Sequence, residues 1–215
     1  MHTISPLSGM SKGEEMWVLG NGPSLNSVPV DEIPILSSIG CNRILKTIPK
    51  MRFVALVDDN VWEQEQKRFR DHGVSLIVHD VLYNKLIRGS YPEHLIWTFP
   101  FEERVPPMGS TTVLHRGYLT GYYAAEIACQ MVRPGGRVIL AGMDLRYTDK
   151  MKERCETHAS GDERPNGASD NRFKEGRAAL KRLRIAASSF GVEMCVAGPS
   201  ALIDEDGFPA YQCLP

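Results

Sequence analysis

The chain has 215 residues, of which 42% are apolar, so it is long enough to form one domain with a substantial core. Lys and Arg (25) nearly balance Asp and Glu (26), and the net charge of -1 gives no reason to expect a stable nucleic-acid partner. Because no apolar run approaches the roughly 20 residues of a membrane span and the polar start resembles no signal peptide, we expect a cytoplasmic protein.

Apolar runs separated by turn signals predict most elements of the first half of the chain. A helix over 60–73 has Val61, Trp62, Gln66 and Phe69 on its apolar side and Gly73 at its end. No state is predicted for 81–94. The strands are expected at 15–20, 35–44, 52–59, 74–80 and 95–100.

The second half alternates helices and strands in the same way. Gly-Ser-Thr-Thr predicts the start of a mostly buried helix over 109–132, and a turn and buried strand follow within 134–147. Residues 148–171 are polar and without periodicity, which indicates a long loop. An amphipathic helix over 171–191 and a strand over 192–198 complete the pattern.

This alternation predicts an α/β fold with a mostly parallel, doubly wound, Rossmann-like sheet. We expect a single domain over 15–209, with the polar loop lying over its site. A flexible leader over 1–14 and a tail over 210–215 flank it, and the sequence leaves a homo-oligomer open.

In such sheets ligands bind at the carboxyl ends of the strands. The predicted strand ends alone place several polar residues at this edge: the Gly20–Ser24 loop, Asn42, Asp58, Asp144 and Ser200. Asp58 and Asp144 could bind a ribose hydroxyl or a divalent ion, whereas Asp59 or Asn60 is expected to cap the following helix.

The first of these features, Gly20-Asn21-Gly22-Pro23-Ser24, has two interpretations of about equal weight. It could be a tight turn, because Gly and Asn tolerate positive φ. It could instead present free N–H groups, the Asn21 amide and the Ser24 hydroxyl to a phosphate. Neither the dinucleotide-binding glycine pattern nor a Walker loop is present.

Six motifs follow one another over about residues 17–209, and their order matches that of a known family. They are VLGNGPSL, CNRI, VDD, GSTTVLHRGYLTGYYAAEIA, VILAGMDLRY and VAGPSAL. The chain resembles the family that groups Campylobacter-type sialyltransferases, motility accessory factor glycosyltransferases and 6-hydroxymethylpterin diphosphokinase. It is also similar to short phage and bacterial members that have THFYGDHP where this chain has THASGDERP, so two aromatic residues are missing here.

The resemblance implies a nucleotide held by Asn21, Ser24 and Asn42. It implies that His158 acts as general base on an acceptor hydroxyl, with Tyr147 as the nearest match by position to a tyrosine that assists the departing phosphate. A histidine suits this role because its ordinary pKa lies near neutrality. A surface-loop histidine is the alternative, and the motif context favours catalysis over it.

Three hypotheses follow. The first is a sialyltransferase-like glycosyltransferase, with a CMP-sugar or another nucleotide-activated donor and a carbohydrate or small hydroxyl acceptor. The second is a diphosphokinase that uses ATP, and only this hypothesis calls for Mg²⁺; no other cofactor and no resident metal site is expected. The third is a nucleotide-binding accessory protein without catalysis. The basic stretch 177–184 is expected to be a solvated helix face.

Overall fold

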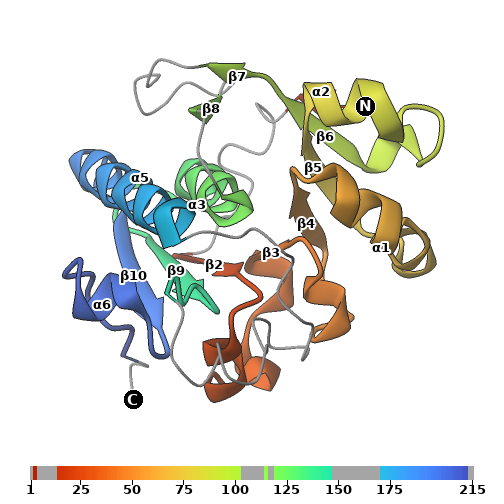
Figure 1. Ribbon diagram of the computed structural model, residues 1–215. Helices are drawn as coiled ribbons and strands as arrows, with labels where there is room; N and C mark the ends of the chain where they lie inside the picture. The colour runs from red at the N-terminus through yellow and green to blue at the C-terminus, as the bar shows by residue number, and fades with distance from the viewer. Residues whose placement is uncertain (1, 4–13, 103–113, 116–118, 147–169, 213–215) are drawn as a thin grey trace.

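The computed structural model describes residues 2–3, 14–102, 114–115, 119–146 and 170–212. Its main element is an eight-stranded sheet in the order β1-β6-β5-β4-β3-β2-β9-β10. Every pair of neighbouring strands in this sheet is parallel (Figure 1). The prediction of an α/β fold with a parallel, doubly wound sheet is therefore confirmed.

The strands are short and mostly buried on both faces, as the continuous apolar runs predicted. In the register of the central pairs, Leu19 lies beside Gly40 on one side and beside Ala141 on the other. The strands are β1 (His2–Thr3), β2 (Glu15–Leu19), β3 (Ser38–Cys41), β4 (Phe53–Leu56), β5 (Ser75–His79), β6 (Ile96–Phe99), β9 (Arg137–Ala141) and β10 (Glu193–Ala197). A separate pair, β7 (Phe101–Glu102) and β8 (Leu114–His115), is also parallel.

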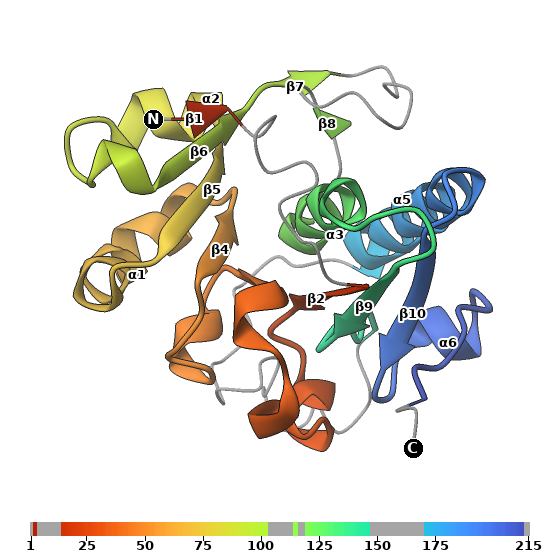
Figure 2. The same cartoon turned by 180° about the vertical axis from the view of Figure 1, so that it is seen from behind.

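Helices cover both faces of the sheet, as Figures 1 and 2 show from opposite sides. They are α1 (Asp59–His72), α2 (Asp80–Leu82), α3 (Thr120–Met131), α5 (Asp170–Ser189) and α6 (Ala201–Asp204). Single turns of 3₁₀ helix lie at Pro23–Ser27, Val30–Glu32, Ile35–Ser37, Ile44–Lys46 and Glu93–Leu95, and a π-helical turn lies at Tyr83–Ile87.

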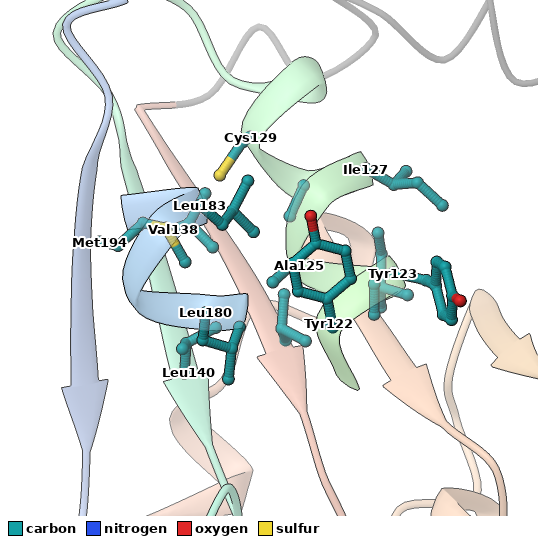
Figure 3. Packing of buried hydrophobic residues seen from close by; sticks show 14 of the residues in the cluster. Tyr122, Tyr123, Ala125, Ile127, Cys129, Val138, Leu140, Leu180, Leu183 and Met194 are labelled. Atoms are coloured by element: carbon teal, nitrogen blue, oxygen red, sulfur yellow. The ribbon is translucent and has the colours of Figure 1, made fainter. Parts of the chain in front are cut away.

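Two hydrophobic clusters sandwich the sheet. On one face α3 and α5 pack against β9 and β10, with Tyr122 and Leu180 among the contacts that Figure 3 shows. On the other face α1 and the 3₁₀ turns supply Val61, Trp62 and Phe69. The connection from β2 to β3 thus runs over one face and the connection from β9 to β10 over the other.

The predicted start of the helix over 109–132 is wrong. In the described residues it begins at Thr120, and Leu114–His115 form β8 instead. The Gly-Ser-Thr-Thr cap signal is local, whereas residues 111–113 have low helix propensity because they are β-branched. The pairing of β8 with β7 places Leu114 and His115 in a strand.

Smaller differences concern element ends. The strand predicted over 35–44 is limited to β3, because Ile35–Ser37 form a 3₁₀ turn. The N-cap position of α1 is Asp58 rather than Asp59 or Asn60, and its side chain makes no capping hydrogen bond. The helix ends at Gly73 in the left-handed region, as predicted. The buried face of α1 includes Glu65, which the sequence pattern placed on the polar side.

Both ends of the chain contribute residues to the sheet region. His2–Thr3, in the predicted leader, pair with β6. Tyr211, beyond the predicted end of the domain, donates its N–H to Val196 of β10 at 2.8 Å. Within the described ranges, no helix is both long and apolar enough to cross a membrane.

Candidate functional site

The connectivity of the sheet places a topological switch point between β2 and β9. These strands are neighbours, and their following connections leave to opposite faces. The loops after Leu19 and Ala141 therefore diverge at the carboxyl edge, which is where open α/β sheets bind ligands. Asn21, Asn42 and Asp144 all belong to this edge, as the sequence predicted.

The backbone N–H groups of the loop after β2 are largely used within the protein. Gly20 N–H donates to Ala141 O at 2.7 Å and Gly22 N–H to Gly142 O at 2.8 Å. Leu25 N–H donates to Gly22 O at 3.0 Å. These amides cannot at the same time donate to a phosphate, so the hypothesis of a cradle of free N–H groups over 20–25 is not supported.

The glycines of this loop are explained by a close approach of two backbones. A Cβ on Gly20 would lie 2.3 Å from Gly142 O, and one on Gly22 would lie 1.7 Å from Asp144 Oδ2. Gly22 has φ -65°, a value that any residue adopts, so the interpretation as a turn that needs positive φ is wrong at this position. The loop after β2 is instead locked against the loop after β9.

Asp144 completes this lock. Its Oδ2 accepts a hydrogen bond from Ser24 N–H at 3.3 Å. Burial raises the pKa of the Asp144 carboxyl above its ordinary value, and the Ser24 hydroxyl and then the Ser24 amide oppose this rise. The Ser24 hydroxyl is buried near this carboxyl but forms no hydrogen bond of normal geometry with the described residues. Ser24 and Asp144, both expected at the carboxyl edge, thus meet across 120 positions of the chain.

A second group of polar side chains gathers beside β3. Asn42 has φ +50°, in the left-handed region that asparagine tolerates. Its Nδ2 donates to Asp58 Oδ2 at 3.4 Å, and its Oδ1 accepts from Thr120 Oγ1 at 3.1 Å. Asn21 Nδ2 donates to Cys41 O at 2.7 Å, which ties the first loop to the end of β3.

This arrangement brings the N-terminus of α3 to the carboxyl edge. Thr120 is the first residue of that helix, and Leu119 before it supplies no side-chain cap. Gly121 packs so closely on Met143 that a Cβ there would lie 2.5 Å from the methionine Cε. The positive end of the α3 dipole therefore lies next to Asn42 and to the loop after β9. The sequence did not predict this, because it placed the helix start at residue 109.

Ser200 has a structural role. It is buried, its Oγ donates to Met143 O, and the same oxygen accepts from Leu202 N–H at 3.1 Å, which caps α6. These two hydrogen bonds occupy the Ser200 hydroxyl, which the sequence had predicted to bind a nucleotide. Pro23 begins a 3₁₀ turn, where its fixed φ is suitable and its missing N–H is no loss.

His79, which the sequence did not single out, lies nearly buried at the end of β5. Its Nδ1 accepts from Leu82 N–H at 3.1 Å, so the proton of the neutral ring is on Nε2, which donates to Val57 O at 3.1 Å. Burial lowers the pKa of His79. Both ring nitrogens are used, which indicates a structural histidine that caps α2.

His158 and Tyr147, the predicted catalytic residues, lie outside the described residues, as does most of the predicted polar loop. Among the described residues no group of three or more His, Cys, Asp or Glu side chains is arranged to hold a metal ion. A hollow of about 500 Å³ lies between Trp17, Ile33, Arg137 and Tyr211, and no predicted site residue lines it.

No protein-family model matches the chain, and a comparison with curated proteins also finds no match. The resemblance drawn from the order of the motifs therefore stays a prediction.

Proposed function

We propose that the chain is a transferase that binds a nucleotide-activated donor at the switch point between β2 and β9. The observation that carries this proposal is the convergence of Asn21, Asn42, Asp58 and Thr120 from four separate segments on one edge of the sheet. Amide, carboxylate and hydroxyl groups of this kind can bind the base and the ribose of a nucleotide.

The donor's phosphate cannot rely on the loop amides, because Gly20, Gly22 and Leu25 donate within the protein. The N-terminus of α3 is better placed for this role, because its first turn lacks a side-chain cap and adjoins Asn42. His158 as base on a carbohydrate or small hydroxyl acceptor, with Tyr147 at the leaving phosphate, remains part of the proposal on sequence grounds.

A second candidate, diphosphate transfer from ATP, is favoured by the charge of this edge. Asp58 and Asp144 both contribute carboxylates there, while Lys85 and Arg146 form ion pairs with Asp59 and Asp204. Carboxylates next to a polyphosphate require a counter-cation, and Mg²⁺ would supply it through oxygen ligands. A metal requirement would therefore select this candidate.

The first experiment is a thermal-shift panel with CMP, CDP, UDP, GDP and ATP, each with and without Mg²⁺. We expect stabilisation by one nucleotide class, because a ligand that binds only the folded state raises its stability by mass action. A metal-independent preference for CMP or another sugar-nucleotide product favours glycosyl transfer. A magnesium-dependent preference for ATP favours diphosphate transfer, and no stabilisation by any nucleotide contradicts both.

Variants then separate binding from catalysis. Asn42→Ala should abolish the thermal shift, whereas Asn84→Ala, whose side chain is exposed and bonded to Asp80 O, should leave it unchanged. His158→Ala should keep the shift and lose slow donor hydrolysis. A protein that shows the shift but turns over no donor, with or without acceptor, would be the accessory binder of the third hypothesis.

A further inference from the structure

The hollow of about 500 Å³ lies on the face of the sheet that carries the 3₁₀ turns after β2. Its volume is within the range of about 300–1,000 Å³ that is typical of small-molecule sites. Four buried residues line its inner part: Trp17, Val28, Ile33 and Ala197. Three exposed residues also line it, so that a ligand can enter from solvent: Ser27, Pro29 and Glu32.

Polar groups that bind one another line part of the hollow. Glu15 forms an ion pair with Arg137, and the Tyr211 hydroxyl donates to Glu15 Oε2 at 3.5 Å. The Arg137 guanidinium lies over the Tyr211 ring, 5.6 Å from its centroid. The Tyr211 ring packs edge-on against Trp17, with ring centroids 5.1 Å apart. This part of the lining therefore offers aromatic surface and little net charge.

The indole N–H of Trp17 is a hydrogen-bond donor without an acceptor. The Trp17 residue is only 6% exposed, and its Nε1 makes no hydrogen bond with the described residues. A buried donor of this kind is rare, because it has lost its bond to water and gained none in return. Since Trp17 lines the hollow, a ligand with an acceptor group can supply the missing bond.

The charge of the lining restricts the ligand further. Two carboxylates, Glu15 and Glu32, line the hollow against one guanidinium, Arg137. Glu15 and Arg137 neutralise each other, whereas Glu32 forms no ion pair within the described part of the chain. An anionic ligand would be repelled by the Glu32 carboxylate, while a cationic group would be attracted to it.

We propose that the hollow binds a small aromatic amine. The aromatic ring of the ligand packs against Trp17 and Tyr211, its ammonium group lies near Glu32, and a hydroxyl or similar acceptor accepts the hydrogen bond from Trp17 Nε1. None of the residues of the proposed nucleotide site lines the hollow. The inference therefore stands even if the proposed function fails.

The probe is tyramine, which combines an aromatic ring, a hydroxyl and an ammonium group. Isothermal titration calorimetry of the whole protein compares it with phenethylamine, which lacks the hydroxyl, and with 4-hydroxyphenylacetate, which has a carboxylate in place of the amine. We expect phenethylamine to bind about fivefold more weakly than tyramine, the typical effect of one neutral hydrogen bond. We expect no binding of 4-hydroxyphenylacetate, because its charge is opposite.

Two variants test the two polar contacts. Glu32→Gln should weaken tyramine binding about threefold, since an ion pair at an exposed carboxylate is weak. Asp31→Asn is its matched control, because Asp31 is exposed on the same 3₁₀ turn and does not line the hollow. Trp17→Phe keeps an aromatic ring but removes the N–H, so it should weaken tyramine about fivefold and leave phenethylamine unchanged.

Several results would overturn the proposal. They are an absence of tyramine binding, equal binding of tyramine and 4-hydroxyphenylacetate, and equal effects of Glu32→Gln and Asp31→Asn. Equal weakening of tyramine and phenethylamine by Trp17→Phe would also contradict it, and Glu32→Gln keeps the test decisive if Trp17→Phe fails to fold. Asn42→Ala should bind tyramine as the unaltered protein does, and loss of tyramine binding in this variant would place the amine at the switch point instead.

Discussion

Replacement of Gly22 by alanine tests whether this glycine serves the close approach of the two loops. The backbone of Gly22, with φ -65° and ψ 150°, suits alanine, so the substitution introduces no backbone strain. The added Cβ would, however, lie 1.7 Å from Asp144 Oδ2 and 2.7 Å from Gly142 O. Both contacts are far below van der Waals distance, and the second involves backbone that cannot turn aside.

Two terms set the expected cost. Overpacking of a tight site costs about 1–3 kcal/mol. Moving the Asp144 carboxylate away also loses its hydrogen bond with Ser24 N–H, which for a charged acceptor contributes about 1.5–3 kcal/mol. We therefore expect Gly22→Ala to lower the free energy of unfolding by about 3 kcal/mol or more, measured by urea denaturation monitored by circular dichroism.

Gly89→Ala is the control, because Gly89 has φ +74° and nothing within 4 Å of an added Cβ. Its cost is backbone strain alone, about 1–2 kcal/mol. A double-mutant cycle with Asp144→Ala should show that the Gly22 substitution costs less once the carboxylate is gone. If Gly22→Ala costs no more than Gly89→Ala, or the cycle shows no coupling, the reasoning about the locked loops is refuted.

Further expectations follow from other parts of the molecule. Arg177→Ala should lower the free energy of unfolding by about 3 kcal/mol, because it leaves the largely buried Asp206 without its cation. Lys67→Ala, which removes an exposed ion pair, should lower it by less than about 0.5 kcal/mol. Urea denaturation of both variants measures the difference. Because burial lowers the pKa of His79, the unfolded state binds this proton at a higher pH than the folded state does. The stability of the protein should therefore fall as the pH drops below the ordinary histidine value of 6.5. This fall in stability should be smaller in His79→Gln. Burial raises the pKa of Cys41 to about 12, so site-resolved thiol labelling at pH 8 should modify Cys41 only after unfolding.

The fold was predictable because its signals are local. Continuous apolar runs such as the one in β9 indicate strands that are buried on both faces, and Gly73 indicates the end of α1. The alternation of strands and helices then predicts a parallel sheet, and the carboxyl ends of its strands indicate where polar residues will gather. Asn42 and Asp144 were found in this way.

The glycines after β2 were interpreted as a tight turn or as a phosphate-binding loop, whereas in the structure they allow a close approach of another backbone. Sequence spacing cannot distinguish a phosphate from another backbone, because both require the Cβ to be absent. In the structure the partner is Gly142, which is 120 positions away from Gly22 and binds its N–H. The same limit applies to Glu65, whose helical position looked exposed because the cations that cover it come from a different segment.

The locked loops also restrict how the proposed site can work. A Rossmann-type loop binds phosphate with its backbone, but here that backbone is held by β9, so recognition falls to the side chains of Asn21, Asn42, Asp58 and Thr120. Side chains of this kind discriminate through hydroxyl and amide groups, which favours selectivity for the base and the ribose over the phosphate. The affinity of the protein for nucleotides should therefore change more when the base is changed than when a monophosphate is replaced by a diphosphate. The exception would be Mg²⁺ bound to the carboxylates, which would restore a strong preference for the longer phosphate chain.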